Sequence, residues 1–271
     1  MATQMTAQQE KRPISATSTR YERANPLQQY GCGPVQSTEN ADALYERHLV
    51  FDNVKVIIKF LNHLASTIDG DPAIRGRLKV LFLPDYCVSL AERLIPASEV
   101  SNQISTAGYE ASGTSNMKFM MNGALTLGTR DGATIEMAEA AGEDNFFLFG
   151  LTATQVATSR AWYRPQWHSD HEPETRAALD LIFSDHFSRT DPGVFAPLRD
   201  TLLTHGDHYM HLANLQSYLE AAQRLVDLYT DLAGWARKAV LNVASSGTFS
   251  SDRTIAEYAA DIWQAKPCPV L

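Results

Sequence analysis

A turn rich in small and hydroxyl residues leads into a short expected helix that carries one lysine. Residues 110–118 read EASGTSNMK, and Lys118 stands one turn inside that helix. Free backbone N–H groups at the start of a helix bind anions such as phosphate. A lysine on the first turn then reaches whatever the phosphate carries. Phosphate and amine together are what a pyridoxal phosphate site needs, because the aldehyde of that cofactor condenses with a neutral lysine.

The same pattern has an ordinary interpretation. Serine, glycine and threonine ahead of an apolar run also form a simple helix N-cap, followed by a solvated lysine. Short motifs of this kind recur by chance, so the pattern alone leaves both interpretations open.

A second group of polar residues lies in the segment 162–171 (WYRPQWHSDH), which we expect to be a loop. His168, Asp170 and His171 are metal-ligand types, but their spacing matches no structural zinc pattern. We therefore predict no metal site.

Short strands alternating with helices are expected to position the lysine turn. An amphipathic helix starts at Asn53 and ends near residues 69–72, and the apolar run 78–83, closed by Pro84, predicts a buried parallel strand. Residues 89–95 predict a helix that Pro96 ends. Beyond the lysine, the expected elements are a strand at 124–127, a turn at 130–132, a helix at 135–141 capped by Gly142, and a strand at 146–149. This alternation indicates a doubly wound α/β sheet.

Strands are not expected beyond Thr152. Helices are predicted over 210–229, 233–243 and 254–263, the last with Asp252 as its N-cap. One apolar stripe of the first of these helices is best explained as core rather than as a cofactor contact; it comprises Leu212, Leu215, Leu219, Ala222, Leu225 and Leu228.

Composition excludes several classes of protein. The chain has 271 residues, 44% hydrophobic and 20% charged, as in ordinary globular proteins. A formal net charge of −8 argues against nucleic acid or an anionic membrane as partner. Three scattered cysteines suit a reducing compartment, and no apolar run reaches the length of a membrane span. We expect a cytoplasmic protein without a signal peptide.

Residues 103–118 (QISTAGYEASGTSNMK) closely resemble the cofactor-lysine segment of the glycogen (α-glucan) phosphorylases. Colinear matches run from about Asn53 to Trp263. They include VLFLPDYCVSLAERLIP at 80–96, NGALT at 122–126, DGA at 131–133, EMAEAAGEDNFFLFG at 136–150, and Asn242 with SGTFSSDRTIA at 246–256. The resemblance implies the latter part of a Rossmann-like, GT-B type C-terminal domain. It also implies phosphorolysis of α-1,4-glucans by inorganic phosphate to give glucose 1-phosphate.

The resemblance also implies roles for individual residues. Lys118 matches the lysine that holds pyridoxal 5'-phosphate covalently. The backbone N–H groups of Thr114 and Ser115 match positions that line the cofactor phosphate, and Tyr86 matches a tyrosine near the cofactor ring. Glu110, with backbone groups of Ser112 and Gly113, matches the groups that bind sugar hydroxyls.

Two of these residues have ordinary alternatives: Glu110 is otherwise a solvated loop acid, and Tyr86 a packed strand-end tyrosine. At Ser115 the family usually has glycine, so the serine is expected to crowd the phosphate or to demand an unfavourable φ.

The resemblance covers only part of the family's pattern. Residues 1–45 look unlike the family and are expected to be disordered; residues 46–151 are expected to form the α/β cofactor part and residues 152–271 the helical part. The family's N-terminal domain, basic segment and glycine-rich loop have no counterpart, so we expect no catalysis by this chain alone.

Several interpretations follow from that partial match. The alternatives are a non-catalytic remnant or interaction module, and one half of a split enzyme that needs a separate N-terminal chain. The expected protein partner is either that N-terminal chain or a second copy of this chain in a homo-oligomer. A retaining glycosyltransferase without pyridoxal phosphate is the enzymatic rival, and the Lys118 segment argues against it.

Overall fold

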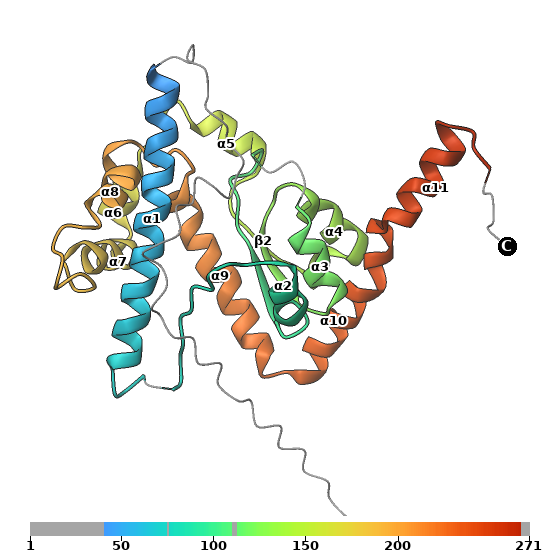
Figure 1. The fold of residues 1–271 in the computed structure, drawn as a ribbon, viewed down its shortest axis with the longest axis horizontal. Coiled ribbons are helices and arrows are strands. Elements are labelled where there is room, and N and C mark those ends of the chain that lie inside the picture. The colour runs from blue at the N-terminus through green and yellow to red at the C-terminus, as the bar shows by residue number, and fades with distance from the viewer. Residues whose placement is uncertain (1–40, 75, 110–112, 267–271) are drawn as a thin grey trace, which may run out of the picture. The chain divides into compact units, whose positions relative to one another are not determined.

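The computed structural model describes residues 41–74, 76–109 and 113–266, with side chains described from Asn53 onward (Figure 1). The chain divides into two units, Met1–His48 and Leu49–Leu271, and the fold below is that of the second. Within the described ranges, no helix combines the length and the apolar character that a membrane span needs. The expected leader covers residues 1–45. Its residues 1–40 lie outside the described ranges, and Ala41 begins helix α1 (Ala41–Gly70).

A three-stranded parallel sheet organises the α/β part. Its strands, in spatial order, are β1 (Val100–Gln103), β2 (Leu125–Thr129) and β3 (Phe147–Phe149). Val100 pairs with Leu125, and Leu127 pairs with Phe147. All five residues of β2 are buried, as expected for a parallel strand covered on both faces. The strands predicted at 124–127 and 146–149 are confirmed.

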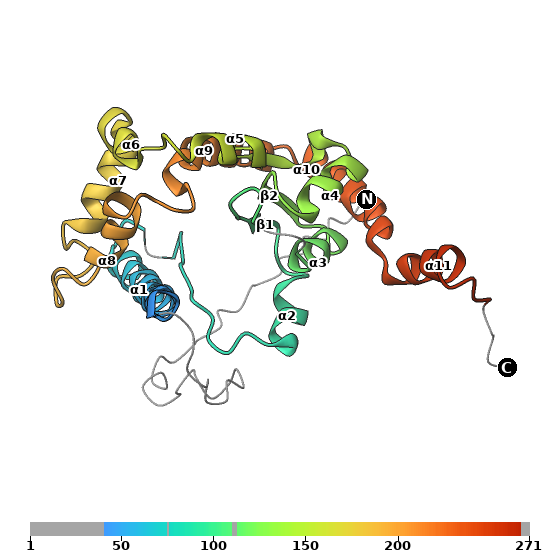
Figure 2. The ribbon, with the colours of Figure 1, turned by 90° about the horizontal axis from the view of Figure 1, so that it is seen from above.

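Helices cover both faces of this sheet. On one face, Leu125, Leu127, Phe147 and Phe149 pack against Ala221 and Leu225 of α9 (His211–Tyr229). On the other, α3 (Ser115–Met121) and α4 (Ala133–Ala141) contribute Met120, Ala133, Met137 and Ala138, which pack with Phe146. Figure 2 shows α9 and α3 on opposite sides of β1 and β2. The fold is therefore a mixed α/β fold around a small parallel sheet.

The remainder of the second unit is helical. After β3 come α5 (Ala153–Ser159), α6 (Pro165–His171), α7 (Pro173–Phe183), α8 (Ala196–Arg199) and the π-helical turn η3 (Asp200–Thr204). The segment between α7 and α8 packs on α1, because Phe60 meets Phe187 and Phe195 edge-on at 5.6 and 5.2 Å between ring centroids. The chain continues through α9, α10 (Leu232–Ser245), η4 (Ser246–Phe249) and α11 (Ser251–Asp261).

Most helix predictions are confirmed, including α2 (Val88–Leu94). A 3-10 turn, η2 (Glu143–Asn145), follows α4. The expected core stripe is confirmed in part: Leu212 and Leu225 are buried, whereas Leu219 is exposed.

Three predictions are wrong. Residues 78–83 form no strand, because no described segment pairs with them, and Leu78 and Leu81 are exposed. The strand before the lysine is instead β1, whose register with β2 compensates for its polar sequence. The segment 162–171 contains α6, which Pro165 begins at N1. Ser250, rather than Asp252, caps α11, since its side chain accepts the N–H of Asp252.

Candidate functional site

The predicted site residues follow the carboxyl end of β1. In parallel α/β sheets, ligands bind in the crevice outside the carboxyl ends of the strands. The loop after β1 leads into α3, and the loop after β2 leads into α4. Both loops therefore meet at the edge of the sheet where a site is expected.

Asp131 fixes the loop that follows β1. Its carboxylate is 7% exposed and accepts hydrogen bonds from Ser105 Oγ and from the N–H of Gly108, both at 2.8 Å. Thr129 Oγ1 accepts the N–H of Ser105 at 3.1 Å. A charged acceptor on two loop donors holds the loop more firmly than neutral bonds would. The backbone leading to the lysine turn is thus anchored to the end of β2.

The turn before α3 is shaped by Gly113. Its φ of +122° lies where side chains are rarely tolerated, and a Cβ there would come within 3.1–3.3 Å of the Asn116 amide. Asn116 is buried and donates to Thr134 Oγ1 at 3.4 Å. The buried amide and the glycine therefore specify this turn together.

The first turn of α3 keeps donors available. Thr114 precedes the helix without giving a side-chain cap, and Asn116 Oδ1 accepts the N–H of Met117 at 2.9 Å. Among the described residues, nothing accepts the N–H groups of Thr114 and Ser115, which keep their capacity to bind an anion. Ser115 has an ordinary φ, and its hydroxyl donates to Gln103 Oε1 at 3.3 Å. The expectation that Ser115 demands an unfavourable φ is therefore wrong.

Lys118 lies on the exposed side of α3, one turn beyond Thr114. Its backbone N–H donates to the Thr114 carbonyl at 3.2 Å. Among the described residues, none forms an ion pair with its ammonium group. An exposed lysine on the same helix as the uncapped turn fits the combination of phosphate and aldehyde that pyridoxal phosphate presents.

Among the described residues, no contact joins the predicted site residue Tyr86 to this turn. Tyr86 precedes α2 and is 62% exposed, so the packed strand-end alternative is wrong, and its role near the cofactor ring stays a prediction. Glu110 and Ser112 lie outside the described residues, and their roles stay predictions.

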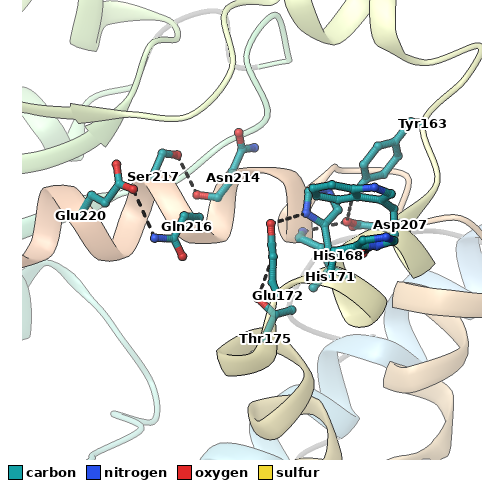
Figure 3. Close-up of polar contacts among 12 residues, drawn as sticks. Tyr163, His168, His171, Glu172, Thr175, Asp207, Asn214, Gln216, Ser217 and Glu220 are labelled. Carbon is teal, nitrogen blue, oxygen red and sulfur yellow. Dashed lines mark hydrogen bonds and ion pairs between the residues drawn. The ribbon is translucent and has the colours of Figure 1, made fainter.

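The histidines of α6 form no metal site. His168 Nδ1 lies 2.8 Å from Glu172 Oε1, and His171 stacks on Trp167. Glu172 also accepts the hydroxyl of Thr175 (Figure 3). Within the part of the chain that is described, no three metal-ligand side chains gather.

A cavity of about 510 Å³ opens at the carboxyl edge of the sheet, on the α9 side. Its lining comes from the loop after β1, the ends of β2 and β3, and the start of α9. These residues are Ile104, Ser105, Thr106, Tyr109, Thr129, Phe149, Tyr209, His211, Asn214, Leu215 and Tyr218. The sequence patterns did not indicate this cavity, because its lining comes from four separate segments.

Asn214 and Ser217 attach α9 to the end of β3. Asn214 Oδ1 accepts the N–H of Leu151 at 2.8 Å, and Ser217 Oγ accepts the N–H of Gly150 at 3.0 Å. These side chains satisfy the backbone donors that β3 leaves unpaired where it stops (Figure 3 shows both residues on α9).

Asp207 fixes the start of α9. It is buried, and its carboxylate accepts the N–H groups of His211 and Leu212 at 3.0 and 2.9 Å. It also accepts the hydroxyl of Tyr163 at 2.8 Å (Figure 3). Burial, reinforced by this carboxylate, raises the pKa of Tyr163 well above its ordinary value.

Sequence reasoning missed Asp131, Asp207 and Asn214. An aspartate three residues before a predicted helix start was the one available signal for Asp207, since carboxylates favour helix N-termini.

Comparison with known proteins gives a family. A family model described as carbohydrate phosphorylase matches residues 50–265. Glycogen phosphorylase of Synechocystis sp. is 51% identical over 214 residues, 79% of this chain and 25% of that protein. Glycogen phosphorylase, brain form, of Homo sapiens is 47% identical over 214 residues, again 79% and 25%. The glycogen phosphorylase of Chlamydia trachomatis is 47% identical over 209 residues, 77% and 26%. The chain thus spans about a quarter of the length of the curated relatives it matches.

Proposed function

Because the chain belongs to the carbohydrate phosphorylase family, we propose that it is the cofactor-binding part of an α-1,4-glucan phosphorylase. The reaction proposed is phosphorolysis of glycogen, starch or maltodextrin by inorganic phosphate to glucose 1-phosphate. The family match and the relatives named glycogen phosphorylases support it. In this proposal the α/β part, residues 46–151, is a piece of a Rossmann-like, GT-B type domain, and residues 152–271 are its helical continuation.

The observation that carries the proposal is the uncapped turn before α3 together with Lys118. We assign Lys118 as the residue that holds pyridoxal 5'-phosphate, with the N–H groups of Thr114 and Ser115 toward its phosphate. The buried Asn116 amide and Gly113 keep that turn in place, so the donors are preorganised. Bound pyridoxal phosphate supplies a phosphate monoester whose second pKa, about 6, suits proton exchange with inorganic phosphate.

The chain's remaining assigned residues bind and orient the sugar. Glu110 and the backbone groups of Ser112 and Gly113 hold sugar hydroxyls, and Tyr86 approaches the cofactor ring. Asp131 acts through the loop: it fixes the segment 105–108, just before these groups. Holding the sugar in one orientation is the main contribution this chain makes to the rate.

The assay of this proposal is glucose 1-phosphate formation from maltodextrin and phosphate. The chain alone is expected to give no turnover, because the other three quarters of the relatives' length supply further groups of the site. Addition of a separate N-terminal chain, if neighbouring upstream DNA encodes one, is expected to restore turnover, and Lys118→Ala to abolish it. Turnover by the chain alone that survives Lys118→Ala would contradict the assignment.

Two further proposals depend on that assay. Cofactor binding without turnover under any recombination supports a non-catalytic remnant or interaction module. Turnover with a second chain supports one half of a split enzyme. We also propose a cytoplasmic location, which suits the chain's few and scattered cysteines.

A further inference from the structure

The loop from Gly206 to Met210, between η3 and α9, holds an unusual backbone. Gly206, Asp207 and Met210 have φ values of +89°, +45° and +53°. Non-glycine residues in this region are strained and persist only where the surroundings over-determine them. Strain of this kind concentrates where a protein must present particular side chains to a ligand.

Three contacts over-determine this loop. The buried carboxylate of Asp207 accepts three hydrogen bonds, as described above. Thr106 Oγ1 donates to the Tyr209 carbonyl at 2.9 Å. Met210 is buried against Ala107 and Val156. The consequence is that Tyr209, 44% exposed, is held at the wall of the 510 Å³ cavity.

Aromatic rings dominate that wall. Tyr109, 53% exposed, meets Tyr209 edge-on with 6.4 Å between centroids, and Phe149 meets Tyr218 at 5.1 Å. Arg160 lies 5.1 Å from the Tyr109 ring centre and bonds its hydroxyl, which fixes that ring from outside the cavity. Two adjacent, partly exposed rings therefore lie at this wall of the cavity.

Polar groups with unused bonding capacity lie among these rings. In the described part of the chain, no residue bonds the hydroxyls of Tyr209 and Tyr218, the His211 imidazole or the Asn214 amide nitrogen. No carboxylate, ammonium or guanidinium group lines the cavity. Its ligand is therefore uncharged, carries several hydrogen-bonding groups and has an apolar face.

We propose that this cavity is a binding site for a neutral pyranose sugar. The C–H face of the ring lies against Tyr109 and Tyr209, whose π faces carry partial negative charge. The sugar hydroxyls bond the Tyr218 hydroxyl, the His211 imidazole and the Asn214 amide. The volume lies within the range of about 300–1,000 Å³ that holds small ligands. Among the described residues assigned to the cofactor or the sugar in the proposed function, none lines this cavity, so the cavity lies apart from Lys118 and the start of α3.

The test is titration of the purified, cofactor-free chain with maltotriose, followed by the NMR signals of Tyr218 and His211. Saturable shifts with a dissociation constant on the order of 1–10 mM are expected. Tyr209→Ala is expected to weaken binding about tenfold, whereas Tyr209→Phe, which keeps the ring, retains most of it. Trp162→Ala is the matched control, because Trp162 is an exposed aromatic outside the cavity and its loss leaves binding unchanged.

Other outcomes overturn the proposal. If maltotriose causes no NMR shifts at Tyr218 and His211, the sugar does not occupy the cavity. The same follows if Trp162→Ala weakens binding as much as Tyr209→Ala does. Tighter binding of glucose 1-phosphate or adenosine than of maltotriose would assign the cavity to an anion or a flat heterocycle. The proposal rests on the proposed function only for the choice of probe. Cofactor attachment at Lys118 is measured separately, so failure of either leaves the other standing.

Discussion

At the scale of single residues, the buried Asp207 connects the start of α9 with Tyr163 through its carboxylate. One carboxylate satisfies two backbone donors of α9 and the Tyr163 hydroxyl. Loss of one partner leaves a buried donor or acceptor without a bond, which costs more than the bond itself contributes. Tyr163 is the partner that can be removed most cleanly.

Tyr163→Phe is expected to lower the free energy of unfolding by about 1–2 kcal/mol at neutral pH. Because the pKa of Tyr163 is raised in the folded state, the folded state keeps its proton after the unfolded state has lost it. The contribution of Tyr163 is therefore complete below about pH 10 and is lost as pH rises above it, by at most about 1.4 kcal/mol per unit.

Denaturant unfolding of both proteins between pH 7 and 11.5 checks this. The difference between wild type and Tyr163→Phe should shrink above pH 10. A difference that stays constant to pH 11.5 would show that Tyr163 titrates normally.

At the scale of elements, the junction of β3 with α9 decides whether the cavity exists. Gly150 has a φ of +81°, and a Cβ there would lie 2.9 Å from Asn214 Oδ1. That oxygen is the acceptor for the Leu151 N–H. A side chain at this position would therefore push α9 away from the end of the sheet.

Gly150→Ala is expected to destabilise the fold by about 2–4 kcal/mol, from backbone strain and the displaced amide together. Gly193→Ala is the matched control: its φ is +78°, but nothing lies within 4 Å of a Cβ there. Thermal unfolding of the two variants separates strain from contact. Equal losses would mean that the Asn214 contact does not matter.

The elements differ in how far the sequence predicts them. β2 and β3 are apolar runs with glycine-containing turns between them, and local pattern is enough to find them. β1 is polar at Ser101, Asn102 and Gln103, so only its pairing with β2 makes it a strand. Residues 78–83 show the converse: an apolar run without a pairing partner does not become a strand. The cavity depends on tertiary contacts among distant segments, which no local pattern contains.

The roles of single residues also divide into those that a local pattern indicates and those that depend on tertiary contacts. The helix that carries Lys118 could be predicted, because the small and hydroxyl residues before it and the lysine lie within a few residues of each other; the cofactor role of Lys118 stays a prediction. Asp131, Asp207 and Asn214 act on loops far away in sequence, as Asn214 does on Leu151 across 63 positions. Their roles emerge only when the fold is known.

At the scale of the whole molecule, apolar side chains in α11 and in the two residues after it are exposed. The exposed fractions are 55% for Ile255, 64% for Ile262 and 58% for Trp263. One edge strand of the sheet is β1, not residues 78–83. Exposed apolar surface of this kind drives association. Each large side chain left in water forgoes about 1.5–3 kcal/mol.

We expect the chain to self-associate at micromolar concentration and above. The double change Ile262→Gln and Trp263→Gln should reduce association, whereas Val240→Gln, on the exposed side of α10, should not. Sedimentation velocity over a range of concentrations measures this. A soluble monomer that unfolds cooperatively at all concentrations would show that these surfaces are covered.

The central claim is that Lys118 holds pyridoxal phosphate. The most direct test is borohydride reduction of the purified chain with the cofactor, followed by peptide mapping by mass spectrometry. Label is expected on Lys118 at about one per chain, and Lys118→Arg should remove it, whereas Lys79→Arg, at another exposed lysine, should not. Label spread over surface lysines, with Lys118 unmodified, would contradict the account.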